Sequence, residues 1–151
     1  MKKIGFIALV FLLLSVLWAP AQSNDVLDRI LGEEQLTYGN AAYLLLVATD
    51  RAEEEVSPQQ AATMAEQEGF AVQGLGSADR LTLGQYSFML MRAFQLPGGI
   101  MYRILPGPRY AAREMEYAGV IQGPAIPGMA LSGNEAVRML ERVLHQREGV
   151  S

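Results

Sequence analysis

The sequence contains no cysteine among its 151 residues. This absence excludes a structural disulfide, a thiol nucleophile and the cysteine that carries the lipid of a lipoprotein. A domain without disulfides depends on its hydrophobic core for stability, and about 130 residues suffice for one such core.

Lysine is also absent after Lys3, so arginine carries the positive charge of the rest of the chain. That remainder has 10 arginines and 16 acidic residues, which leaves a net charge of −6. An acidic domain repels the phosphate backbone, and we therefore expect no nucleic-acid partner.

The first residues have the composition of a signal peptide. Met1-Lys2-Lys3 is positively charged, Ile4 to Trp18 is an almost unbroken apolar run, and Ala19-Pro20-Ala21 fits a cleavage site. We predict a signal peptide over 1–21 and one domain over 22–150, exported to the periplasm or cell surface. An uncleaved membrane anchor is the alternative, although the run is shorter than the roughly 20 residues that span a bilayer.

No pattern in the sequence indicates an enzyme or a metal site. His145 falls in the last turn of a predicted helix, and no G-x-S-x-G motif accompanies it. Met89 and Met91 are two residues apart on a helix, so they cannot face one copper ion together. The acidic pairs at 33–34 and 53–55 lie in charged runs typical of a solvated surface. We expect no catalytic residue, metal or cofactor.

The chain is organised around a helix start at Thr82. The Thr82 side chain can cap the first free amides, and Gln85 can reach back to the Thr82 amide. Similar starts occur at Ser132 with Glu135, at Ser57 and, in weaker form, at Thr37. Gly69 and Gly119 are expected to end two helices in a left-handed conformation.

These signals predict an all-α fold. The two most apolar predicted helices, over 37–50 and 82–94, should lie at its centre. Shorter helices are expected over 24–31, from Ser57 to Gly69, from Tyr110 to Ala118 and after Ser132. Between two Pro-Gly turns, the alternation of Ile100, Tyr102 and Ile104 predicts a short extended segment over 100–105.

An internal repeat is visible in the sequence. Residues 57–94 align with 107–144 without a gap, with nine identities over 38 positions. The identities fall on helix starts, stop glycines and core positions. With a shortened first copy, they predict three helix-loop-helix units over 24–50, 57–95 and 107–145.

The repeated unit resembles the S-layer homology (SLH) domain. In that family a short helix ends in a Gly-Ile/Val-Ile-x-Gly phrase, and Leu/Ile-Thr-Arg-Ala-Glu opens a longer one. Residues 119–123 (Gly-Val-Ile-Gln-Gly) look like the first motif, and 131–135 (Leu-Ser-Gly-Asn-Glu) look like the second. The resemblance implies three units around a pseudo-threefold axis and binding to cell-wall polysaccharide.

The family's motif arginine has no counterpart here, because its positions are Tyr38, Leu83 and Gly133. The motif glutamate persists only as Glu135, and the aromatic residue before the first helix is Tyr110 rather than tryptophan. The resemblance therefore predicts the fold better than it predicts the ligand. The alternative is that these motifs serve only as helix caps and core residues.

One stretch is positively charged, although the chain as a whole is acidic. It contains Tyr102, Arg103, Arg109, Tyr110 and Arg113, with no acid before Glu114. Arginine can bind carboxylate or phosphate, and tyrosine can carry a sugar ring or an apolar partner surface. We name these five residues as the candidate ligand site. The alternative is that the tyrosines pack and the arginines pair with nearby acids.

Together these observations predict an exported, non-enzymatic envelope module that binds cell-wall glycan or an envelope protein. Two other classes stay open. A protein-protein scaffold would expose an apolar patch well above about 600 Å². A small-ligand carrier would enclose a pocket of at least about 300 Å³. Contact with a membrane is expected only through the signal peptide.

Overall fold

A computed structural model describes residues 21–149, and the predicted signal peptide lies almost entirely outside this range. The described chain is all-α, as predicted, with seven helices and no strand. The helices are α2 (Ala21–Leu31), α3 (Tyr38–Ala48), α4 (Pro58–Gln67), α5 (Leu83–Ala93), α6 (Ile100–Ile104), α7 (Pro108–Tyr117) and α8 (Gly133–Glu148).

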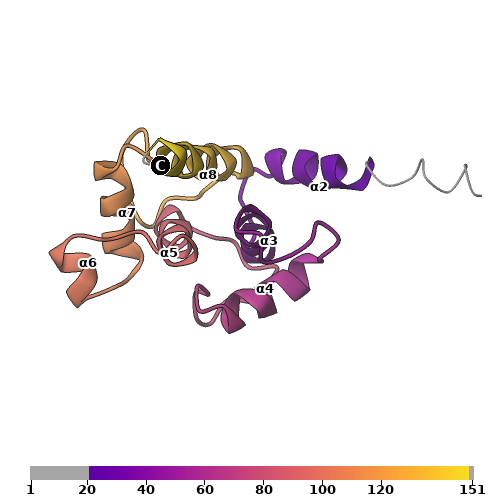
Figure 1. The fold of residues 1–151 in the computed structure, drawn as a ribbon, viewed down its shortest axis with the longest axis horizontal. Coiled ribbons are helices and arrows are strands. Elements are labelled where there is room, and N and C mark those ends of the chain that lie inside the picture. Colours follow the sequence, from indigo (N-terminus) through magenta and orange to yellow (C-terminus); the bar gives the residue numbers. More distant parts are fainter. Residues whose placement is uncertain (1–20, 150–151) are drawn as a thin grey trace, which may run out of the picture.

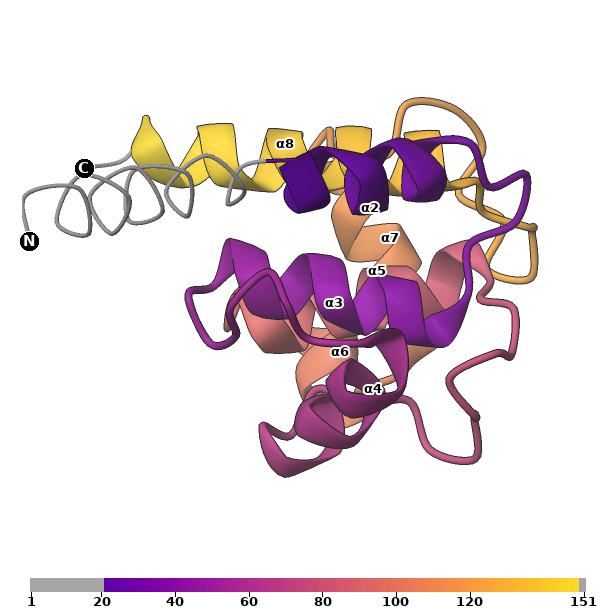
Figure 2. The same cartoon turned by 90° about the vertical axis from the view of Figure 1, so that its right-hand side faces the viewer.

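The two apolar helices α3 and α5 lie side by side at the centre of the fold (Figure 1). Helix α4 packs on α3, and α7 packs on α5. Figure 2 shows α8 and α2 together along one side of this central pair. Among the residues whose burial is described, the core runs from Ile30 to Val143, and a chain that begins at residue 22 keeps all of these side chains.

Local side-chain chemistry sets where the helices begin. Ser57 and Thr82 each form a capping box with the glutamine three residues later. Ser132 accepts from the Glu135 amide at 3.2 Å. Thr37 occupies the expected position, but its side chain makes no capping bond. Instead the Glu33 carboxylate accepts from the Thr37 amide at 3.2 Å, which satisfies an otherwise free donor.

Four helices end in the same hydrogen-bonded turn. At Gly69 (φ +77°) and Gly119 (φ +73°) the following amide donates back to the helix, from Phe70 to Ala65 and from Val120 to Met115. This is the Schellman motif, for which glycine suits the left-handed residue. Asp50 (φ 54°) and Gln95 (φ 51°) occupy the equivalent positions after α3 and α5 without being glycine.

We expect Gln95→Gly to raise the free energy of unfolding by about 0.5 kcal/mol. Relief of the left-handed strain outweighs the entropy that glycine adds to the unfolded chain. Gly119→Ala is the matched opposite and should lower it by about 1 kcal/mol. Urea unfolding followed by circular dichroism measures both changes, and equal effects of the two substitutions would contradict this account of the turns.

The extended segment expected over 100–105 is wrong, because Ile100–Ile104 form helix α6. The Arg103 amide donates to the Gly99 carbonyl at 3.0 Å, and the Leu105 amide donates to the Met101 carbonyl at 2.9 Å. A strand needs a neighbouring strand to satisfy its backbone groups, and the described residues provide none here. Local helical bonds satisfy them instead.

The loops before α3, α5 and α8 meet through Leu36, Leu81 and Leu131, which are fully buried. The Leu81 amide donates to the Leu36 carbonyl at 2.9 Å, and the Leu36 amide donates to the Leu131 carbonyl at 2.7 Å. The beginning of the described chain is thereby joined directly to its last third.

Residues at equivalent positions of the proposed units make matching contacts. The Tyr38 amide donates to the Asp79 carbonyl at 2.7 Å, and the Leu83 amide donates to the Met129 carbonyl at 2.8 Å. Arg92 donates to the Gly69 carbonyl at 2.9 Å. The corresponding Arg142, fifty residues later, donates to the Val120 carbonyl at 2.8 Å. The three-unit repeat itself stays a prediction, which these pairs of contacts favour.

Candidate functional site

The five residues predicted as a ligand site lie on two packed helices, Tyr102 and Arg103 on α6 and the other three on α7. Arg103, Arg109 and Arg113 are exposed. None of the three guanidinium groups makes a hydrogen bond or ion pair within residues 21–149. The structure therefore does not pair these arginines with nearby acids.

The two tyrosines of the set are half-buried. Tyr102 packs against Gly98 and lines a groove of about 410 Å³ with Arg92 and Arg103. Burial raises the pKa of the Tyr102 phenol, opposed by Arg92 and reinforced by Glu114. Tyr102 therefore packs against its neighbours and also forms part of the wall of an open groove.

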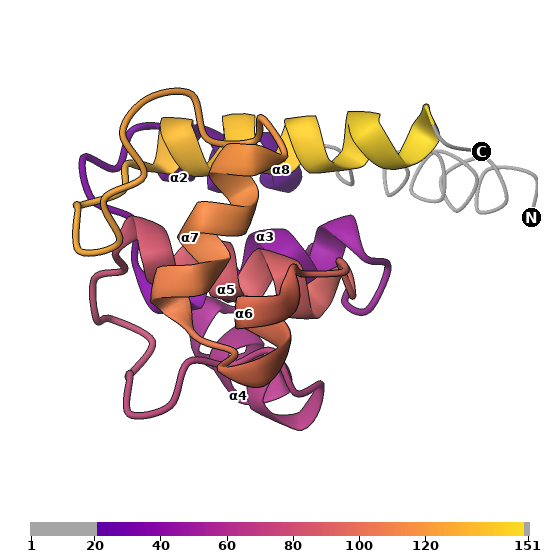
Figure 3. The same ribbon diagram turned by 90° about the vertical axis from the view of Figure 1, so that its left-hand side faces the viewer.

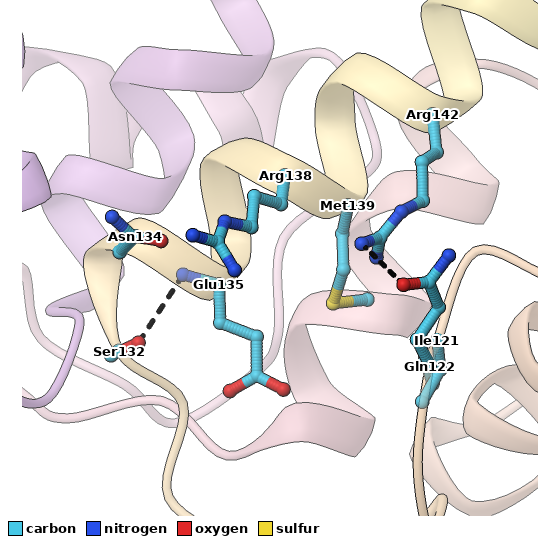
Figure 4. Close-up of a pocket in the computed structure, with 8 residues that line it drawn as sticks. All are labelled: Ile121, Gln122, Ser132, Asn134, Glu135, Arg138, Met139 and Arg142. Atoms are coloured by element: carbon cyan, nitrogen blue, oxygen red, sulfur yellow. Dashed lines mark hydrogen bonds between the residues drawn. The ribbon is translucent and has the colours of Figure 1, made fainter.

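A polar pocket lies at the beginning of α8 and has a volume of about 310 Å³ (Figure 4). Arg142 donates to Gln122 at 3.1 Å across one side of it. The Glu135 carboxylate and the Arg138 guanidinium have no partner within the described chain. Glu135 is the one motif glutamate that the SLH resemblance retained, and its charge is available to a ligand.

A second polar pocket, which we call the α3 pocket, lies at the beginning of α3 and has a volume of about 360 Å³. Its lining comes from the segments before and within α3, from the first turn of α4 and from the loop that precedes α5. These residues are Arg29, Glu33, Thr37, Asn40, Pro58, Gln59, Ser77 and Ala78.

Asn40 is the most unusual residue of the α3 pocket. It is 6% exposed, and its side-chain amide nitrogen donates to the Glu33 carboxylate at 2.5 Å. Because Glu33 can only accept, this bond fixes the orientation of the amide. The Asn40 Oδ1 is then left buried without a hydrogen-bond partner. Buried groups of this kind are rare and costly. The Tyr38 hydroxyl is likewise buried without a partner among the described residues, but Asn40 differs from it in lining a pocket, where a donor from outside the chain would stabilise the oxygen.

The sequence did not single out Asn40 as a site residue. The only available signal was its place three residues after Thr37, where the other helix starts carry Gln60, Gln85 and Glu135. A shorter side chain at that position cannot reach back to cap the helix, which leaves it for another role.

The positions of the family's motif arginine are unsuited to ligand binding here. Tyr38 and Leu83 are fully buried, and Gly133 is buried against the end of α2. A Cβ atom at Gly133 would fall on the Ile30 carbonyl group. Any glycan binding by this chain must therefore use other residues.

The described residues contain no group of three or more His, Asp or Glu side chains that could hold a metal ion. Met89 and Met91 lie in the core, and His145 is exposed near the end of α8. In this part of the chain the clearly shifted pKa values belong to four tyrosines, Tyr38, Tyr43, Tyr86 and Tyr102, and burial is the main cause in each.

These tyrosines make the fold sensitive to alkali. Burial raises the pKa of the fully buried Tyr86 phenol above its ordinary value of 10.0. Above pH 10 the unfolded chain releases this proton while the folded chain keeps it, so the free energy of unfolding must fall. We expect a slope of about 1.4 kcal/mol per pH unit from Tyr86. Urea unfolding at several pH values measures it, and a slope unchanged in Tyr86→Phe would contradict the assignment.

Comparison with protein-family models, with curated proteins and with solved structures found no match. Within residues 21–149 no helix has the length and apolar character needed to cross a membrane.

Proposed function

We propose that this chain is an exported, non-enzymatic module of the cell envelope that binds a hydroxyl-rich glycan in the α3 pocket. The observation that carries the proposal is the buried Asn40 Oδ1, which has no donor among residues 21–149. A sugar hydroxyl supplies such a donor, and pairing it recovers the desolvation cost of the buried oxygen.

The rest of the pocket suits the same ligand. Gln59 and Ser77 offer hydrogen-bonding side chains at its edge. The Arg29 side chain is exposed and makes no hydrogen bond or ion pair within the described residues, so it is free to pair with an acidic substituent of the glycan. The class of ligand is therefore an acidic polysaccharide rather than a neutral apolar molecule.

The placement of the pocket agrees with the SLH resemblance. The α3 pocket lies where the start of one long helix meets the short helix and loop of the next proposed unit. Gly39 and Gly84 occupy equivalent places in this junction, and a Cβ atom on either would approach a proline carbonyl oxygen, at 2.7 Å from Pro58 and 2.9 Å from Pro108. The matched contacts support the repeat on which the resemblance rests.

The test is sedimentation with purified cell wall of the chain from residue 22. We expect the wild-type chain to sediment, and both Arg29→Gln and Asn40→Leu to weaken binding at least tenfold, the loss of one buried bond to a ligand being worth about 1.4 kcal/mol or more. Arg29→Gln changes an exposed side chain, so it keeps the test valid if Asn40→Leu unfolds the chain.

The matched control is the triple change Arg103→Gln, Arg109→Gln and Arg113→Gln, which removes three exposed charges elsewhere. Loss of sedimentation in the triple variant with none in Arg29→Gln would move the glycan site to α6 and α7. No sedimentation of the wild-type chain would remove the glycan proposal altogether. The role of scaffold for an envelope protein would then be the better account.

A further inference from the structure

Helix α6 exposes an unusual amount of apolar surface. Ile100 is 75% exposed, Met101 49%, Ile104 66% and Leu105 58%, and no residue of α6 is buried. The other exposed large apolar residues of the described chain, Leu27, Tyr117 and Ile126, belong to three different segments. Single exposed apolar residues are ordinary, but a group of four on one short segment marks a contact surface.

Three arginines lie on α6 and on the helix packed against it. Arg103 lies within α6, and Arg109 and Arg113 lie one turn apart on the helix that packs against it. All three are exposed and unpaired within the described residues. The acids of α7 are Glu114, which is half-buried beside Gly99, and Glu116, which is exposed near the end of the helix. The surface formed by α6 and the exposed arginines of α7 is therefore cationic, although the whole chain has a net charge of −4.

The position of α6 suits a flat partner. It lies at the outer edge of the fold, at the opposite end of the long axis from α2 (Figure 1). In Figure 3 it lies in front of the central helices beside α7. The groove beside α6 is lined by Tyr102 and Arg103, and none of the four exposed apolar side chains lines it. A lipid surface accepts exposed apolar groups of this kind without a groove.

We propose that α6 docks this protein on an anionic lipid bilayer. The four apolar side chains enter the boundary between headgroups and acyl chains, and the three arginines bind the lipid phosphates. The arginine stems lie along the apolar layer while their charged ends stay at the headgroups. This peripheral contact is separate from the α3 pocket and from the predicted signal peptide.

The test uses a tryptophan placed on α6. The only tryptophan of the chain is Trp18, so the chain from residue 22 has none. In Ile100→Trp we expect a blue shift of the emission with vesicles of phosphatidylglycerol and phosphatidylcholine, and none with phosphatidylcholine alone. Ile126→Trp, on a different exposed loop, is the matched control and should show no shift.

Two sets of substitutions separate the apolar and charged contributions to binding, measured by vesicle sedimentation. Ile104→Ser with Leu105→Ser should weaken binding at least tenfold. The triple change of Arg103, Arg109 and Arg113 to glutamine should weaken it roughly a hundredfold, and added salt should do the same to the wild-type chain. These side chains are exposed, so the variants should keep the wild-type circular dichroism.

Three outcomes would overturn the proposal. One is no binding of the wild-type chain to anionic vesicles, and another is binding that none of the α6 and α7 substitutions changes. The third is a blue shift of Ile100→Trp that grows with protein concentration without vesicles, because a second copy of the chain would then cover α6. None of these results depends on cell-wall binding, so the two proposals are tested independently.

Discussion

Gly133→Ala is expected to lower the free energy of unfolding by about 3 kcal/mol or more, equivalent to roughly 10 °C in Tm. Gly133 begins α8, and its amide donates to the Glu33 carbonyl at 2.9 Å. A Cβ atom there would fall on the Ile30 carbonyl group, 2.7 Å from its carbon. The Ile30 carbonyl belongs to the backbone, and the backbone of residue 133 fixes the position of the Cβ atom. Rotation of a side chain cannot relieve the clash, so α8 must shift relative to α2.

Gly128→Ala is the matched control for this substitution. Gly128 lies in the loop before α8 and has no atom within 4 Å of the place where its Cβ atom would stand. It should leave Tm within about 2 °C of the wild-type value. Thermal unfolding followed by circular dichroism compares the two, and a Gly133→Ala chain as stable as Gly128→Ala would show that α2 and α8 do not meet as closely as described.

The second large effect is expected at Tyr86, where replacement by alanine should cost about 4 kcal/mol. The side chain is fully buried on α5, and its hydroxyl donates to the Ala136 carbonyl of α8 at 3.1 Å. Alanine leaves a cavity of nearly a whole ring between these helices. Tyr86→Phe removes only the hydrogen bond and should cost about 1 kcal/mol.

Urea unfolding of the two variants measures the contribution of the ring and of the hydroxyl separately. The pair is informative because both act at one position in one packing environment. If Tyr86→Phe were as destabilising as Tyr86→Ala, the hydrogen bond to α8 would dominate, and the packing account of the α5–α8 contact would be wrong.

The helix starts and ends could be predicted from the sequence because their chemistry is local. Thr82 and Gln85 are three residues apart, and the left-handed conformation of Gly69 ends the helix that directly precedes it. Such signals are complete within one turn of chain. The all-α class follows from the number of these signals.

The wrong prediction at α6 and the absence of Asn40 from the predicted site residues have the same cause. Whether Ile100–Ile104 forms a strand depends on a partner strand elsewhere, which alternation within six residues cannot reveal. Whether Asn40 is a site depends on its burial and on Glu33 holding one end of its amide. Both facts arise from packing between distant segments. The unpaired state of Arg103, Arg109 and Arg113 is likewise a property of the folded surface.

The bond from the Leu36 amide to the Leu131 carbonyl has a consequence for how the chain reaches its native state. The two residues are 95 positions apart in the chain of 151, so the contact cannot form until the segment just before the last helix has been made. Closing so distant a pair is entropically slow. A chain that emerges from a ribosome or a translocation channel in order must therefore keep Ile30 and Leu36 without their final neighbours until late in synthesis, and removal of everything from Leu131 onward would return it to that incomplete state.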